Sequence, residues 1–118
     1  MAEGYEPRPI GLAEKSITID RTNISESILD SSIKCYQVGN VVFLQINALQ
    51  VKNDISNYGN FLSELPLPIN EIYVPLFENS AKTSHECRIT TSGVLQAWYG
   101  NFVTTGVYYG CITYLTNS

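Results

Sequence analysis

One tryptophan and the polar side chains near it are the residues of this chain best suited to binding chemistry. Trp98, the only tryptophan, lies in the stretch ECRITTSGVLQAWYG, which also carries Glu86, Arg88 and Gln96. His85, the only histidine, directly precedes this stretch. An aromatic ring can stack on the C–H face of a sugar, while carboxylate, guanidinium and amide groups take its hydroxyls in pairs. Together these residue types favour saccharide binding.

The stretch reads as two strands around a tight turn, and the register of the turn decides which face Trp98 occupies. A two-residue Ser92-Gly93 loop would mix polar and apolar side chains on both faces. A three-residue loop that begins at Thr91, with Gly93 in the left-handed conformation, separates them. One face is then apolar: Cys87, Ile89, Leu95, Ala97 and Tyr99. The other face is polar: Glu86, Arg88, Thr90, Gln96 and Trp98. We therefore predict the three-residue loop.

A structural interpretation of the same residues stays open at this point. Trp98 could pack against a neighbouring subunit or against the proline-rich segment, with Glu86 and Arg88 forming an ordinary cross-strand ion pair. His85, at the mouth of the hairpin, could join a ligand site or lie in a solvated loop. The sequence thus predicts a polar face around Trp98 with two alternative uses.

Catalysis and metal binding have little support in the sequence. A glycan depolymerase would need two carboxylates at a fixed separation, and no motif positions the glutamates in the second half of the chain: Glu64, Glu71, Glu78 and Glu86. The three cysteines are far apart, with no C-x-x-C pair: Cys35, Cys87 and Cys111. We therefore expect free, buried thiols, no metal site, no cofactor and no enzymatic activity.

Composition sets the broad class. The 118 residues are 44% hydrophobic and 15% charged, with a formal net charge of -4. This predicts one globular domain with no basic surface for nucleic acid or anionic lipid. No run of residues is apolar enough to insert into a membrane, and no secretory signal is expected at the N-terminus. Free thiols fit folding in a reducing compartment.

Short strands and frequent turns dominate the pattern after the first fifteen residues. Residues 1–15, rich in Pro and Gly, suit an extended linker or shaft remnant, and residues 16–118 form the predicted head domain. The stretch SIKCYQVGNVVFLQINAL predicts a hairpin that turns at Gly39-Asn40. The three prolines of LSELPLPINEIYVPLF confine that segment to turns and an edge strand. A short helix over residues 23–34 is the one helical alternative.

Two of these strands are apolar on both faces. In the 33–46 hairpin, pairing Val38 with Val41 gives one apolar face and a second face that is also apolar near the turn. The strand over residues 107–115 behaves the same way. We expect the surplus apolar face to pack against another sheet or another subunit. The fold class that follows is an all-β, antiparallel sandwich or barrel.

The chain also resembles a known family. A GNVV hairpin, a Pro-punctuated segment ending in YVP, the strand–turn–strand RITTSGVLQAW and a terminal ITYLT strand are similar to the C-terminal head domain of phage tail receptor-binding proteins that act on Gram-positive hosts. The resemblance covers residues 32–118. It departs from the family before that, because no heptad or Gly-X-Y shaft precedes the head.

The resemblance implies several properties. The fold would be a jelly-roll-like β-head, assembled as a homotrimer at the virion tail tip after synthesis in the bacterial cytoplasm. The partner would be a host cell-wall saccharide, bound near subunit boundaries by the hairpin residues that match the family's site: Arg88, Trp98, His85 and Glu86. The polar face of the hairpin adds Gln96 to these candidates. A purely structural virion or baseplate domain is the first alternative, and a small glycan depolymerase is the second.

Overall fold

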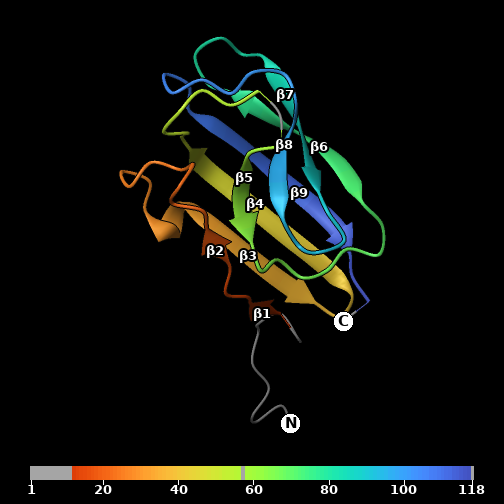
Figure 1. The fold of residues 1–118 in the computed structure, drawn as a ribbon. Helices are drawn as coiled ribbons and strands as arrows, with labels where there is room; N and C mark the ends of the chain where they lie inside the picture. Colours follow the sequence, from red (N-terminus) through yellow and green to blue (C-terminus); the bar gives the residue numbers. More distant parts are fainter. Residues whose placement is uncertain (1–11, 57, 118) are drawn as a thin grey trace, which may run out of the picture.

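The computed structural model describes residues 12–56 and 58–117 and is all-β (Figure 1). These residues form one antiparallel sheet that curls into a half-barrel, with the strand order β1-β3-β4-β9-β6-β7-β8-β5-β2. The predicted fold class is confirmed. The strands are β1 (Ala13–Glu14), β2 (Thr18–Ile19), β3 (Ile33–Val38), β4 (Val41–Leu49), β5 (Asn60–Ser63), β6 (Ile72–Glu78), β7 (Ser84–Ile89), β8 (Leu95–Tyr99) and β9 (Tyr108–Leu115).

The core fills the inside of the curl. In the β3–β4 hairpin, Val38 pairs with Val41 as predicted, and the turn residue Gly39 has a φ of 57°. The predicted inner face of this hairpin is buried: Ile33, Cys35, Val42, Leu44 and Ile46. An aromatic cluster extends the core, because the Phe102 ring lies 5.1 Å from that of Phe61 and 4.7 Å from that of Tyr108. The helical alternative is replaced by a 3-10 turn, Asp30–Ser32.

The outward face of β4, β9 and β6 carries several exposed apolar side chains among polar ones. β9 turns Tyr108, Ile112 and Tyr114 inward, so its other side faces solvent. Besides Tyr73, the exposed large apolar residues of these three strands are Phe43, Phe77, Tyr109 and Leu115, which we call the outer apolar face. A hollow of about 330 Å³ opens beside this face at Cys111, so one cysteine is exposed rather than buried.

The other two cysteines lie in the core as free thiols, as predicted. Burial raises the pKa of Cys35 to about 11, and burial also raises the pKa of Cys87. Both groups therefore stay protonated at neutral pH and pack as small hydrophobic side chains.

Pro75 lies inside β6, at a position where only one side of the strand is paired. β6 pairs with β9 only through Phe77 and Glu78, so at Pro75 the strand has β7 as its single paired neighbour. The absent N–H group of proline is tolerated there, as on an edge strand. Gly110 of β9 passes close by, since a Cβ at this position would lie 2.9 Å from Leu76 Cδ2.

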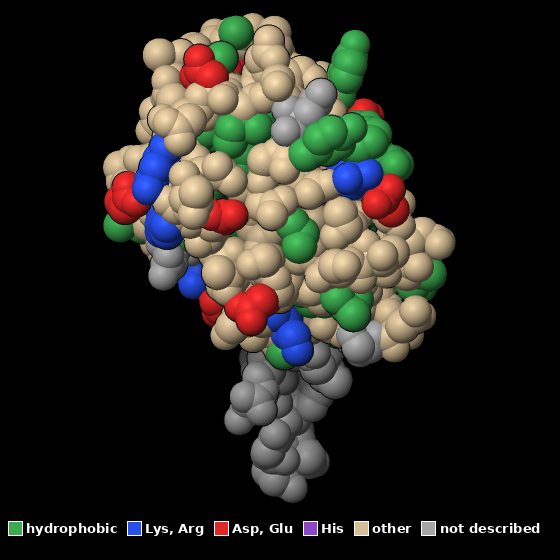
Figure 2. Space-filling model, viewed as in Figure 1, with side chains coloured by type: hydrophobic (Ala, Val, Ile, Leu, Met, Phe, Trp, Pro, Cys, Tyr) green, Lys and Arg blue, Asp and Glu red, His purple; other side chains and the backbone are tan. Residues whose placement is uncertain are grey.

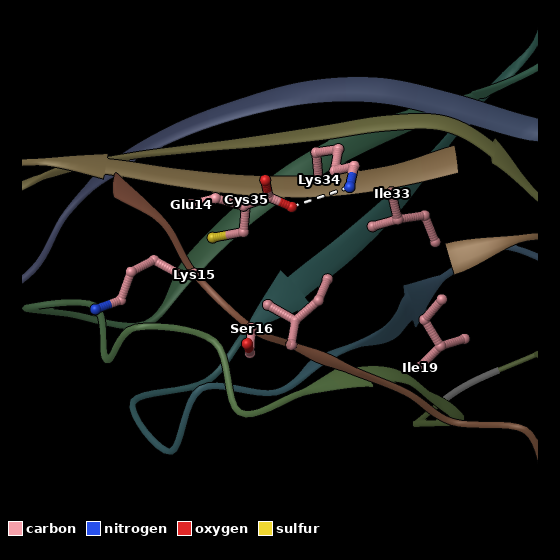
Figure 3. Close-up of a pocket in the computed structure, with 8 residues that line it drawn as sticks. Glu14, Lys15, Ser16, Ile19, Ile33, Lys34 and Cys35 are labelled. Atoms are coloured by element: carbon pink, nitrogen blue, oxygen red, sulfur yellow. Dashed lines mark hydrogen bonds and ion pairs between the residues drawn. The ribbon is translucent and has the colours of Figure 1, made fainter. Parts of the chain in front are cut away.

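One short segment pairs with both edges of the sheet. β1 pairs with β3 at one edge and β2 pairs with β5 at the other, so residues 13–19 cross the open side of the half-barrel. Ala13 and Glu14, which the sequence prediction assigned to the linker, are therefore part of the sheet. Figure 3 shows the seam between this segment and β3, where Ile19 faces Ile33 and the Lys34–Glu14 ion pair of 2.9 Å spans the gap.

Gly93 closes the β7–β8 turn in a crowded position, and its replacement tests the predicted loop. Its φ is 80°, and a Cβ would lie 2.4 Å from the Leu65 carbonyl oxygen. We expect Gly93→Ala to lower the free energy of unfolding by at least about 3 kcal/mol, because a left-handed backbone penalty of about 1–2 kcal/mol adds to a clash with main chain. Gly39→Ala is the matched control, since φ is positive but no atom lies within 4 Å. It should cost only about 1 kcal/mol in urea unfolding. Equal losses for the two variants would contradict the turn geometry.

Glu78 anchors the β6–β7 loop through its carboxylate. It accepts hydrogen bonds from the Ala81 and Ser80 main-chain N–H groups, at 2.6 and 3.2 Å, and these bonds lower its pKa below the ordinary 4.5. The stabilisation is therefore complete above about pH 4.5 and disappears as the pH falls through the lower pKa of the folded state.

We expect Glu78→Gln to unfold at lower urea concentration than the wild type at pH 7. Because the wild-type carboxylate also becomes neutral in acid, the difference between the two proteins should narrow steadily below pH 4.5. Urea unfolding curves at several pH values measure this difference. A difference that stays constant down to pH 2 would show that the charge on Glu78 does not stabilise the loop.

Candidate functional site

A row of polar side chains crosses four strands on the outward side of the sheet. Tyr73 of β6 pairs with Arg88 of β7, Arg88 pairs with Gln96 of β8, and Gln96 pairs with Asn60 of β5. Strand residues directly opposite one another have their Cβ atoms about 5 Å apart, so the four side chains are neighbours. The register of the sheet therefore aligns residues that lie far apart in the sequence.

Hydrogen bonds and one ion pair join this row from end to end. Arg88 Nε donates to Gln96 Oε1 at 2.9 Å, and Arg88 Nη2 donates to the same oxygen. Gln96 Nε2 then donates to Asn60 Oδ1 at 2.9 Å. On the other side, Arg88 Nη1 lies 3.6 Å from Glu71 Oε1, which accepts the Tyr73 hydroxyl at 2.8 Å. The row is a continuous network, and such networks hold side chains in one arrangement.

Aromatic rings surround the guanidinium of this network. The Arg88 Cζ atom lies 4.1 Å from the centre of the Trp98 ring, within the range of a cation–π contact. The Trp98 ring is flanked by Tyr58 at 5.4 Å and Tyr73 at 5.5 Å, both tilted. We call the aromatic rings and the hydrogen-bonded row together the Trp98 surface: Tyr58, Asn60, Glu71, Tyr73, Arg88, Gln96 and Trp98.

The surface combines an ordered interior with accessible rings. The Arg88 side chain is only 20% exposed, whereas Tyr58 and Tyr73 are 59% and 49% exposed. The hydrogen bond to Glu71 raises the pKa of Tyr73, so its hydroxyl stays protonated. In Figure 2, hydrophobic side chains gather beside basic and acidic groups at the upper right of the molecule, near the upper ends of β7 and β8 in Figure 1. Two exposed tyrosines beside fixed polar groups can contact a ligand without rearrangement.

The hairpin that builds this surface has the predicted register over most of its length. Cys87 pairs with Ala97 and Ile89 with Leu95, and Gly93 N donates to Thr90 O at 2.9 Å across the turn. The prediction fails at the open end, where a bulge shifts the pairing so that Glu86 lies opposite Tyr99. Tyr99 was predicted on the apolar inner face, but the bulge turns its side chain outward and leaves it 71% exposed.

Three of the five predicted site residues come together. Trp98, Arg88 and Gln96 are in contact, as described above. Glu86 shares the outward face of β7 with Arg88, but the ion pair of Arg88 is formed with Glu71. Arg88 therefore belongs to a network with Glu71 and Gln96, in place of the simple Glu86–Arg88 ion pair of the structural alternative.

His85 does not belong to the Trp98 surface. As a neighbour of Glu86 in a strand, it points to the opposite side of the sheet. Its ring lies 5.0 Å from Phe102 and 5.2 Å from Tyr108, and its Nε2 atom lies 3.2 Å from Thr83 Oγ1. The expectation that His85 joins Trp98 is corrected, because strand alternation separates the two side chains.

His85 instead lines a separate surface pocket of about 340 Å³ together with residues of the neighbouring loops, among them Thr83, Asn101 and Thr105. The carboxylate at this pocket, Glu78, is already hydrogen-bonded within its own loop. We therefore assign the pocket no ligand.

Four residues of the Trp98 surface were not found by sequence reasoning: Tyr58, Asn60, Glu71 and Tyr73. Tyr58 and Asn60 belong to the stretch VKNDISNYGN, which the sequence indicates only as a polar loop. The loop is held in place because Tyr58 N donates to Ala97 O at 2.7 Å, and Tyr58 has a left-handed φ of 64°. A tyrosine within the polar run NYGN was the one available signal. Tyr73 could be found only by knowing that β6 pairs with β7.

No known protein-family model matches the chain, and neither does any curated protein. Within residues 12–56 and 58–117, no three His, Cys, Asp or Glu side chains come together as possible ligands of a metal ion. The same part of the chain contains no helix with the length and apolar character needed to span a membrane.

Proposed function

We propose that this chain is the non-enzymatic receptor-binding head of a phage tail protein and that it recognises a saccharide of the host cell wall. The observation that supports the proposal is the Trp98 surface. It presents exposed aromatic rings next to amide and carboxylate groups, which is the combination that sugar recognition needs. The proposed place of action is the tail tip of the virion.

The contacts with Arg88 change which rings a sugar would meet. One face of Trp98 is covered by the guanidinium, so stacking falls to the two exposed tyrosines, Tyr58 and Tyr73. The Asn60 amide and the Glu71 carboxylate lie next to these rings and can bind hydroxyl groups. In this proposal Trp98 and Arg88 hold the surface in shape, and the tyrosines contact the ligand.

We further propose that the head is a homotrimer assembled through the outer apolar face. Exposed apolar patches of this kind mark interaction surfaces. β6 contributes Tyr73 to the Trp98 surface and Phe77 to the outer apolar face, on the same side of the sheet. A saccharide site would then lie near a subunit boundary. The same apolar face supports the second candidate function, a purely structural virion domain without a ligand.

Binding to polysaccharides separates these functions. The protein is applied to an array of purified cell-wall polysaccharides from diverse Gram-positive bacteria, and bound polymers are then incubated with it to measure new reducing ends. The proposal predicts binding to at least one polymer without an increase in reducing ends. Absence of binding to every polymer would favour the structural domain, and new reducing ends would favour a depolymerase.

A further inference from the structure

The charges of the Trp98 surface restrict the kind of saccharide that it can bind. Cell-wall polymers fall into two chemical classes, neutral polysaccharides and polymers with phosphate or carboxylate groups. A positive site favours the second class, because free arginine or lysine groups make the strongest hydrogen bonds to phosphate and carboxylate groups. The charge balance around Arg88 therefore bears on the choice between the classes.

Arg88 is the only basic residue on the outward side of β6, β7 and β8, all of whose residues are described. Its guanidinium is largely engaged. Nη1 faces Glu71, Nε and Nη2 donate to Gln96, and the Trp98 ring covers one face of the group. An anionic ligand would have to displace a carboxylate or an amide from it.

Acidic groups outnumber this one base. Glu71 pairs with Arg88, and the exposed Glu86 lies two residues from Arg88 on the same face of β7. The formal charge of the three side chains is thus -1, in a chain whose net charge is -4. A phosphate or carboxylate approaching this surface would be repelled by two carboxylates and attracted by a single base that is already engaged.

We propose that the ligand of the Trp98 surface is a neutral saccharide, bound through tyrosine stacking and hydrogen bonds to uncharged hydroxyl groups. This inference rests on the proposed function and adds the chemical class of its ligand. Arg88 is a positioning residue within this site. Binding between neutral groups is insensitive to ionic strength, whereas binding of a polyanion weakens steeply as salt is added.

The test compares a neutral wall polysaccharide, freed of phosphodiesters with hydrofluoric acid, with a glycerol-phosphate teichoic acid. Affinities are measured for the full chain at 50 and 500 mM NaCl. We expect the neutral polymer to bind with less than about a threefold change across this range. Glu86→Gln, which removes the exposed carboxylate on the same face of β7 as Arg88 and lies outside the Trp98 surface, should alter that affinity by less than about threefold.

Each result decides a different point. Binding only to the teichoic acid, weakened by salt and tightened by Glu86→Gln, would overturn the neutral-ligand inference and leave saccharide recognition standing. Binding to neither polymer, nor to any polymer of the array, would overturn the proposed function itself and the inference with it. Salt-independent binding of the neutral polymer supports both.

Discussion

Trp98→Ala should weaken polysaccharide binding by at least about 30-fold, equivalent to about 2 kcal/mol, the loss expected when a central aromatic residue of a binding surface is removed. The Trp98 ring contacts Arg88, Tyr58 and Tyr73, so its loss frees the guanidinium and both tyrosines from their fixed positions. Affinity would be measured by biolayer interferometry with the polymer identified on the array.

Two further variants make this result specific. Tyr58→Ala, at an exposed ring, should cause a comparable loss of affinity with little change in thermal stability. Tyr36→Ala is the control, because Tyr36 lies on β3, which four strands separate from β8 in the sheet. It should bind as the wild type does. Full binding by Trp98→Ala or by Tyr58→Ala would rule out the Trp98 surface as the saccharide site.

The second large effect concerns assembly. We expect the wild type to sediment as a trimer of about 39 kDa, three times the 13.1 kDa of the chain. Phe77→Arg and Tyr109→Arg should each convert it to the monomer. The two rings are neighbours on the outer apolar face, with centres 6.0 Å apart, and each substitution replaces one ring with a charge that the interface would have to bury. Analytical ultracentrifugation measures both masses.

Leu29→Arg is the matched control for assembly. Leu29 is also an exposed apolar residue, but it belongs to the loop before the 3-10 turn and not to the outer apolar face. This variant should remain a trimer. A monomeric wild type, or arginine variants that retain the wild-type mass, would contradict assembly through this face.

The sequence predicted those features that follow from strand alternation and turn chemistry. Gly39-Asn40 and Gly93 located two hairpin turns, and alternation then assigned buried and outward side chains within each hairpin. Alternation also brought Trp98, Arg88 and Gln96 to one face, because all three belong to the same local hairpin.

Features that depend on contacts between distant segments could not be predicted in this way. Tyr73 reaches the Trp98 surface through the β6–β7 pairing, and Tyr58 reaches it through a loop hydrogen-bonded to β8. The bulge that exposes Tyr99 has no sequence signature, and it reverses a side chain that simple alternation assigned to the core. His85 was misplaced because nearness in sequence was taken for nearness in space.

The most direct measurement of the central claim is an NMR titration of the isotope-labelled chain with an oligosaccharide cut from the polymer that binds. The claim predicts the largest chemical-shift changes at the Tyr58 and Tyr73 ring protons and at the side-chain amide of Asn60, with the His85 ring unaffected. Shifts confined to the His85 pocket or to the outer apolar face, with these three groups unchanged, would contradict it.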